Sequence, residues 1–168
     1  MPIIILPEPI AAYFVADKRN AEVVAEKPAY RKAFVSHPCL VPADGFYEWK
    51  QIGLKEKQPY FFTTKFKEPF AFAGLWEWWR AKDAPLDAPG LETFTILTTE
   101  PNELVGQSII ECRSCSLGTS GRIGSGRPDQ RKTLLRSFPA ERTECWPVGK
   151  AVGNVRNGSP ELIERIVA

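Results

Sequence analysis

The order of hydrophobic and polar positions predicts one helix followed by a series of strands. Between residues 21 and 34, alanine, glutamate, lysine and arginine alternate with apolar residues at helical intervals, and Pro28 interrupts them. We therefore expect a loop up to Pro28 and a short helix from about Ala29. β-Branched and aromatic runs, separated by Gly, Pro and charged turns, then predict strands. These runs cover residues 39–41, 45–50, 59–65, 71–80 and 92–99.

The end of the chain is less regular. Pro101 and the residues after it can open a helical turn, with proline at an early position. Residues 160–167 are consistent with a closing helix or an extended tail. Together the elements predict an α+β fold, in which a curved, mostly antiparallel sheet or open barrel carries peripheral helices.

Composition limits the classes of function. A chain of 168 residues with 43% hydrophobic and 25% charged residues is typical of one globular domain. The net charge of +2 is too small for a globally basic nucleic-acid binder, so any such contact has to come from a local cluster. The apolar first residues are a poor match to a signal peptide, because prolines interrupt them and no basic segment precedes them. The four cysteines are too unevenly spaced for a disulfide scaffold. We expect a cytoplasmic monomer that uses no cofactor and no membrane.

The candidate chemistry centres on one carboxylate, Glu48. It stands between Tyr47 and Trp49 on an apolar strand and is followed by Lys50. Partial desolvation favours the neutral form of a carboxylic acid, which makes Glu48 a candidate general acid. The alternative is a strand end whose glutamate points into water, since every second residue of a strand faces outward.

A second aromatic run, from Leu75 to Trp79, contains three tryptophans and is followed by Arg80 and Lys82. Stacked tryptophans can form a platform for unpaired bases. The alternative is packing in the core or at its rim, because alternate strand residues face the interior in any case.

Three segments together resemble the SOS response-associated peptidase (SRAP) family, whose members process abasic sites in single-stranded DNA. The segments are the turn from Pro42 to Gly45, the aromatic strand after it, and the run from Trp146 to Asn157. The resemblance covers about residues 22–107 and 133–165. It implies an abasic-site enzyme with peptidase and lyase-type chemistry that forms a covalent link to single-stranded DNA and processes its own N-terminus.

In that family an N-terminal cysteine attacks the ring-opened aldehyde, and its amine and thiol close a thiazolidine ring. An asparagine, a glutamate and a histidine surround this cysteine. Glu48 matches the glutamate of the Gly-aromatic-aromatic-Glu-Trp motif. The segment from Arg19 to Glu22 contains the residue types of the family's Asn-Ala-Arg motif in a different order, and it makes Asn20 the candidate for the asparagine. Position 2 is Pro2 and no cysteine precedes Cys39, so we expect an impaired single domain, truncated at its N-terminus relative to the family.

The resemblance also implies contacts to DNA around the same segments. A flexible strand is positioned by point charges and forked guanidiniums, while aromatic side chains stack on its bases. For each basic residue the alternative is ordinary solvated surface. The candidate DNA contacts are Tyr47, Trp49, Lys50, Arg80, Lys150 and Arg156.

A shifted reading frame explains why the family's histidine motif is absent. The segment from Ser108 to Ser116 is compatible with the codons TCC ATC ATC GAA TGC CGG TCA TGC TC. One A placed in front gives Ile-His-His-Arg-Met-Pro-Val-Met-Leu, which contains the family's Ile-His-x-Arg-Met-Pro. We therefore expect an irregular segment at about residues 108–131, whose Ser, Gly and Arg content buries little surface. Sequencing the gene across this segment tests the frameshift.

Two rival interpretations remain open. Cys112 and Cys115 have a C-x-x-C spacing that is also found in zinc-stabilised modules, with Cys39, Cys145 or His37 as further ligands. In the other interpretation the chain has the fold of the family but not its catalytic activity, and is a non-catalytic single-stranded DNA-binding module or a remnant. His37 lies outside the family's histidine motif, and we interpret it as a surface or turn residue.

Overall fold

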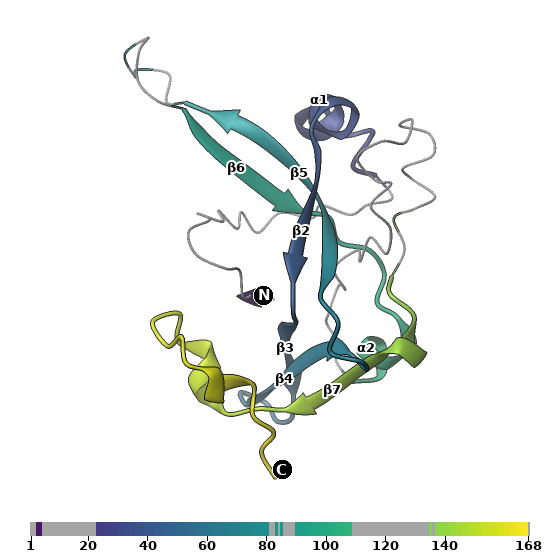
Figure 1. Cartoon of the computed structure of the whole chain (residues 1–168), viewed down its shortest axis with the longest axis vertical. Helices are drawn as coiled ribbons and strands as arrows, with labels where there is room; N and C mark the ends of the chain where they lie inside the picture. The colour runs from purple at the N-terminus through teal and green to yellow at the C-terminus, as the bar shows by residue number, and fades with distance from the viewer. Residues whose placement is uncertain are drawn as a thin grey trace.

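The computed structural model describes residues 3–4, 23–80, 83, 85, 90–108, 135 and 137–167, and its strands form two antiparallel sheets. The elements are β1 (Ile3–Ile4), α1 (Pro28–Ser36), β2 (Pro38–Ala43), β3 (Phe46–Gln51), β4 (Lys57–Thr64), β5 (Phe70–Trp79), β6 (Leu91–Ile96), α2 (Glu103–Ser108), the 3-10 turn η1 (Ala140–Arg142), β7 (Thr143–Pro147), and the 3-10 turns η2 (Lys150–Gly153) and η3 (Pro160–Ile163). One sheet has the strand order β1-β3-β4-β7 and the other β2-β5-β6, as Figure 1 shows. Neither sheet closes on itself, so the predicted α+β fold with an open antiparallel sheet is confirmed.

Helix α1 begins at Pro28, as its sequence predicts. The fixed φ of proline suits the first turn of a helix, where its missing N–H leaves no hydrogen bond unmade. The helix ends at Ser36, and the N–H of His37 closes its last turn by donating to the Ala33 carbonyl oxygen at 2.8 Å. Ala33 and Phe34 are the buried residues of this helix, and they pack against the sheet that contains β5.

The three-stranded sheet extends into a two-stranded ribbon. Strand β5 pairs with β2 only as far as Leu75, opposite Pro38. Beyond that residue β5 continues with β6 alone, up to the pair of Trp79 and Leu91. This β5–β6 ribbon projects from the rest of the molecule, with α1 beside its base (Figure 1).

The main apolar core lies between the two sheets. The Phe46 ring of β3 stacks on the Phe62 ring of β4 at a centroid distance of 5.1 Å, and its edge meets Phe72 of β5 at 5.8 Å. The core therefore defines an inner face of the four-stranded sheet, which is directed toward the other sheet. Its buried members are Val41, Ala43, Phe46, Phe62, Phe72, Ile96, Val105 and Phe138.

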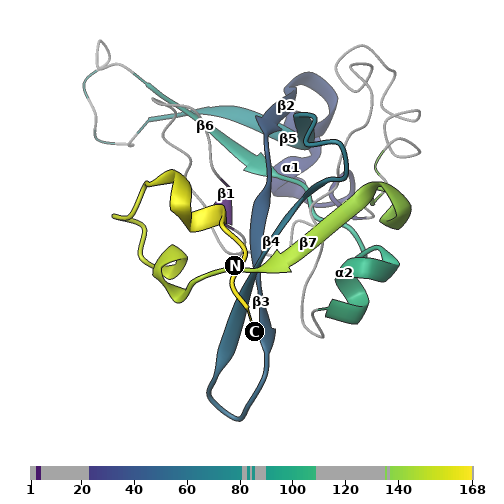
Figure 2. The same cartoon turned by 60° about the horizontal axis from the view of Figure 1, so that its bottom comes forward.

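A smaller cluster covers the outer face of the four-stranded sheet. It contains Tyr47 and Phe61 from the strands and Val148, Val152 and Leu162 from the C-terminal segment, with η2 and η3 on this side (Figure 2). The C-terminal segment is tied down by the Trp146 Nε1–H, which donates to the Ile163 carbonyl oxygen at 2.7 Å. This cluster explains why both faces of β3 are covered.

The five predicted strands and the helix after Pro28 are present, with ends that shift by one to three residues. The helical turn expected after Pro101 is α2, and the Asn102 side chain accepts a hydrogen bond from the Val105 N–H at 2.9 Å at its start. The closing segment forms the short turn η3 and no longer helix. Strands β1 and β7 were not predicted. Within the described residues, no helix has the length and apolar character needed to cross a membrane.

Candidate functional site

Glu48 lies on the inner face of β3 with only 5% of its surface exposed. It stands opposite Tyr60 of β4 and shares its face with Phe46 and Lys50, two residues away on either side. The alternative in which this glutamate points into water is therefore wrong. Its carboxylate is shielded from solvent, as a candidate general acid requires.

The aromatic residues beside Glu48 in the sequence are not the ones beside it in space. Tyr47 and Trp49 belong to the cluster on the outer face of the sheet. Successive side chains of a strand point to opposite faces, so sequence neighbours point away from each other. The aromatic residue opposite Glu48 is Tyr60, which the sequence analysis missed. Alternation alone gives the face of a residue, but the register between two strands is needed to find its partner.

The inner face changes from apolar to polar along β3 and β4. Phe46 and Phe62 form one pair, Glu48 and Tyr60 the next, and Lys50 and Gln58 the third. The Gln58 amide donates to the backbone carbonyls of Pro59 at 2.9 Å and Val148 at 2.8 Å. Glu48 thus stands where the dry core meets the polar end of the sheet. A carboxyl group in this position can exchange a proton with a ligand at the polar end while the core limits access of water.

Strand β1 runs along the free edge of β3 beside this site. Ile4 is opposite Phe46 and Ile3 is opposite Tyr47, in antiparallel register. A step from Ile4 to Ile3 is therefore a step along β3 toward Glu48. The pairing places Ile3 beside Tyr47, the residue that precedes the candidate acid on β3.

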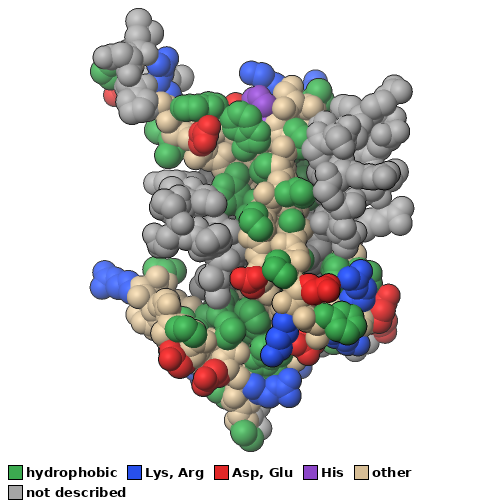
Figure 3. Space-filling model, in the orientation of Figure 1, with side chains coloured by type: hydrophobic (Ala, Val, Ile, Leu, Met, Phe, Trp, Pro, Cys, Tyr) green, Lys and Arg blue, Asp and Glu red, His purple; other side chains and the backbone are tan. Residues whose placement is uncertain are grey.

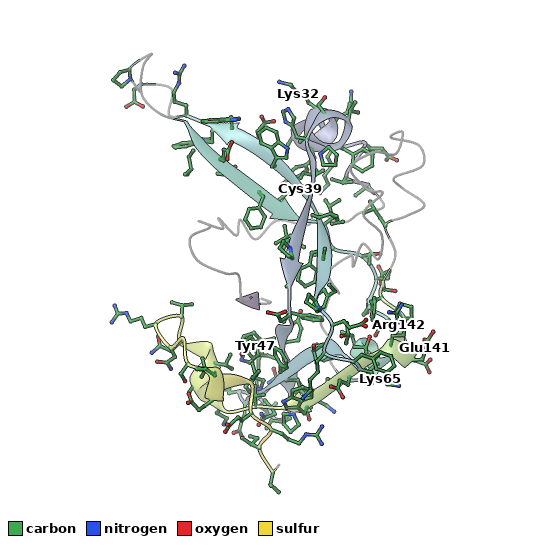
Figure 4. All side chains as sticks on the ribbon, viewed as in Figure 1. Lys32, Cys39, Tyr47, Lys65, Glu141 and Arg142 are labelled. Carbon is green, nitrogen blue, oxygen red and sulfur yellow. The ribbon has the colours of Figure 1, made fainter. Side chains whose placement is uncertain are left out.

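Tyr47 is 1% exposed, and its ring lies 5.2 Å from that of Phe61. Burial raises the pKa of its hydroxyl group, which has no hydrogen-bond partner among the described residues. Figure 4 shows Tyr47 where β3 and β4 meet. Trp49 is half-buried in the same outer cluster. A base-stacking role for these two residues stays a prediction, and what they do in this structure is pack the C-terminal segment onto the sheet.

The structure does not gather the predicted basic contacts into one patch. The Lys150 ammonium group pairs with the Glu56 carboxylate at 2.5 Å, and this contact lowers the pKa of Glu56. Lys50 is half-buried on the inner face, and Arg156 is exposed after η2. Arg80 follows β5, in the other sheet (Figure 1). Contact of these residues with DNA stays a prediction.

Several predicted features lie outside the described residues. They include Asn20, the pair Cys112 and Cys115, and the segment at about residues 108–131 apart from its first residue in α2. In the part of the chain that is described, no group of three or more His, Cys, Asp and Glu side chains could hold a metal ion.

Cys39 is half-buried at the edge of the main core, on β2 opposite Gly74. Burial raises the pKa of its thiol to about 11. A nucleophilic cysteine needs a low pKa and access to its substrate, so Cys39 does not have the properties of one.

We expect iodoacetamide to modify Cys39 slowly in the folded protein at pH 8 and rapidly after denaturation. A pKa near 11, against an ordinary value of 9.0, reduces the thiolate fraction at pH 8 by roughly a hundredfold. Because the folded-state pKa is the higher one, the protonated thiol stabilises the fold below pH 9, and this contribution is lost between pH 9 and 11. Peptide mass spectrometry with and without urea measures the two rates, and a Cys39→Ser variant identifies the peptide. Equal rates in both conditions would contradict the burial.

The tryptophans of β5 are divided between the two faces of the β5–β6 ribbon. Trp76 stacks on the ring of His37 at 4.5 Å, and Trp78 and Trp79 are 55% and 59% exposed. His37 occupies the turn between α1 and β2, as expected, and its Nδ1 lies 3.5 Å from Oε1 of Glu77. Packing at the rim therefore describes Trp76, whereas a base-stacking platform of Trp78 and Trp79 stays a prediction.

Two open antiparallel sheets around an apolar core, with a buried carboxylate where the inner face becomes polar, define an α+β protein. The chain belongs to the family of the SOS response associated peptidase (SRAP), whose model matches residues 12–155.

Similar proteins are known from several organisms. "Abasic site processing protein YoqW" of Bacillus subtilis (strain 168) is 40% identical over 150 residues, which cover 86% of this chain and 65% of the relative. "Abasic site processing protein HMCES" of Gallus gallus is 27% identical over 180 residues, 93% of this chain and 52% of that protein. A crystal structure of a protein from Bacteroides thetaiotaomicron matches with a TM-score of 0.76 and 26% identity, over 88% of this chain and 65% of that one. The chain thus spans less than two thirds of the length of these relatives.

Proposed function

We propose that this chain binds abasic sites in single-stranded DNA at the inner face of β3, with Glu48 as the acid–base group. The family membership and the names of the relatives support the substrate class. The observation that supports the site most strongly is the burial of Glu48 at the polar end of the core, beside the edge strand β1.

Glu48 suits the proton transfers of this chemistry. The ring-opened abasic sugar has an aldehyde, to which an amine adds to form a carbinolamine. Loss of water then forms the imine, and the leaving hydroxyl group needs a proton. A carboxyl group that stands between Phe46 of the core and Lys50 of the polar end can supply that proton and recover it.

We further propose that the covalent step of the family is impaired in this chain. A thiazolidine needs an amine and a thiol on one residue, and Pro2 has a ring nitrogen without a thiol. Once the Met1–Pro2 bond is cleaved, the free amine of Pro2 can form an iminium ion with the aldehyde, but it cannot close the ring. Burial raises the pKa of the Cys39 thiol to about 11, which keeps it protonated near neutral pH. The family's histidine motif is not present in the frame as written. The self-processing peptidase activity depends on the same N-terminal residue and belongs to the same proposal.

A pair of gels tests both parts with one short single-stranded oligonucleotide, with and without an abasic site. On the native gel we expect a complex that favours the abasic strand. On the denaturing gel we expect no adduct without reductant, and an adduct after borohydride reduction of the iminium. Glu48→Gln should slow this trapping by at least about a hundredfold, since general acid–base catalysis contributes roughly 10²–10⁴-fold.

Glu141→Gln is the matched control, because Glu141 is an exposed glutamate of η1, outside β3 and β4, and should leave trapping unchanged. Equal binding of both oligonucleotides would overturn the substrate class. An adduct that survives denaturation without reductant would overturn the impairment. A native complex without any trapping would favour the non-catalytic binding module.

A further inference from the structure

A cavity of about 530 Å³ lies between helix α1 and one face of the β5–β6 ribbon. Its wall on the helix includes Tyr30 and Ala33, and its wall on the ribbon includes Leu75, Trp79 and Thr95. The cavity belongs to the three-stranded sheet, and Glu48 belongs to the other sheet (Figure 1). It is therefore a second site, separate from the one proposed for the abasic sugar.

The walls of this cavity suit a flat aromatic ring. Trp79 is 59% exposed, so its indole ring offers a free surface at the rim. Tyr30 adds a half-buried aromatic ring from the helix. Cavities of roughly 300–1,000 Å³ with mostly apolar walls and a few polar groups are the usual form of a small-ligand site.

The polar groups of the cavity lie on the ribbon, close together. Glu77 and Thr93 are opposite each other, and the Thr93 hydroxyl donates to the Glu77 carbonyl oxygen at 3.1 Å. Oε1 of Glu77 accepts from the Trp78 N–H at 3.2 Å. The hydroxyl oxygen of Thr95 is buried and has no hydrogen-bond partner among the described residues. A carboxylate and an unused hydroxyl group thus stand beside the aromatic walls.

We propose that this cavity binds an unpaired nucleobase that has an exocyclic amino group. The base stacks on Trp79, its amino group donates to the Glu77 carboxylate, and the Thr95 hydroxyl pairs with a neighbouring ring atom. Glutamate accepts in this way from the N4 amino group of cytosine, whereas uracil and thymine present a carbonyl oxygen that a carboxylate repels. The site therefore selects the bases with an exocyclic amino group, which are adenine, cytosine and guanine, over uracil and thymine.

Charges on α1 extend the site toward a phosphate. Arg31 and Lys32 are exposed on this helix, and Figure 4 shows Lys32 above the base of the ribbon. Figure 3 shows basic side chains at the helix, and hydrophobic and acidic side chains together on the ribbon. A nucleotide that stacks on Trp79 can thus direct its phosphate toward the helix. The same chemistry fits a free nucleotide and a nucleotide within an unpaired strand.

The opposite face of the ribbon provides an internal comparison. There a cavity of about 850 Å³ is lined by Trp78, Glu92 and Phe94, with β2 as its other wall. The Trp78 ring lies so close to Gly90 that a Cβ at that position would clash with it. Trp78 and Trp79 are adjacent and almost equally exposed, but they face different cavities.

The test follows the indole N–H signals of the chain by NMR during titration with adenosine, cytidine and uridine. We expect adenosine and cytidine to shift the Trp79 signal and to bind at least about fivefold more tightly than uridine. Trp79→Ala should weaken adenosine binding roughly tenfold or more, because one stacked base is lost. Trp78→Ala should leave it unchanged within about twofold, since that residue is outside the proposed site. Glu77→Ala should remove the preference for cytidine over uridine.

A second set of measurements separates the two sources of the base. Lys32→Ala should weaken binding of an oligodeoxycytidine strand, and increasingly so at low salt, while leaving cytidine unaffected if the site serves a strand. An equal loss for cytidine monophosphate and the strand would indicate a free nucleotide. Circular dichroism shows whether each variant is folded. The selectivity between bases is measured on the unaltered chain and does not depend on any variant. Equal affinity for cytidine and uridine, or a shift of the Trp78 signal in place of Trp79, would overturn the proposal.

Discussion

Replacing Phe62 by alanine should lower the free energy of unfolding by about 3–5 kcal/mol. Phe62 is 0% exposed and stands at the centre of the core between the two sheets. Its ring stacks on Phe46, and its strand neighbours in the register are Phe46 on β3 and Cys145 on β7. Removal of the ring leaves a cavity that the paired strands on both sides cannot close. Urea unfolding followed by circular dichroism measures the loss.

Phe66→Ala is the control for this measurement. Phe66 follows the same strand by two residues and is 74% exposed in the turn after β4. Its replacement should change the free energy of unfolding by less than about 0.5 kcal/mol, as at most exposed positions. Similar losses for both variants would mean that the core does not lie where the two sheets meet.

The strands that the sequence predicts are those with their own local signal. The run around Glu48 and the run ending at Trp79 are dense in aromatic residues, and such runs favour strands wherever they pack. Strand β7 has half-buried residues and ends in Pro147, so its sequence has no comparable signal. It exists because β4 offers a free edge, with Cys145 opposite Phe62. The pairing of β4 with β7 joins segments far apart in the chain, so a local sequence pattern cannot predict it.

The sequence predicts Glu48 as the candidate acid, but it does not predict which side chains surround it. The position of Glu48 on an apolar strand made it a candidate for partial desolvation, and the structure decides for burial over the solvent-facing alternative. Its surroundings were assigned to Tyr47 and Trp49, whereas the register places Tyr60 opposite it. The pair of Lys150 and Glu56 was missed for the same reason, since it joins the β3–β4 turn to η2. Sequence proximity is a good guide along a helix or turn, but in a sheet the nearest side chains come from another strand.

Replacing Pro2 by cysteine should convert the chain from one that forms no denaturation-resistant adduct into one that does. Under the proposed function, cleavage of the bond to Met1 leaves the new residue with a free amine beside its thiol. The amine condenses with the aldehyde of the abasic sugar and releases water. The thiol then adds to the imine carbon, a carbon–sulfur bond forms, and the thiol proton passes to the nitrogen. The next residue, Ile3, pairs with Tyr47, which is the neighbour of Glu48 in the sequence.

Pro2→Ser isolates the thiol, because serine provides the same primary amine with an oxygen in place of sulfur. Its imine should be trapped by borohydride and should not survive a denaturing gel without it. Adding Glu48→Gln to Pro2→Cys should slow adduct formation roughly a hundredfold if Glu48 moves the proton. If Pro2→Cys binds the abasic strand on a native gel yet forms no adduct, the amino-terminal residue does not reach the sugar. If its adduct forms equally fast with and without Glu48, the thiol needs no acid from β3, and the buried carboxylate serves the fold alone.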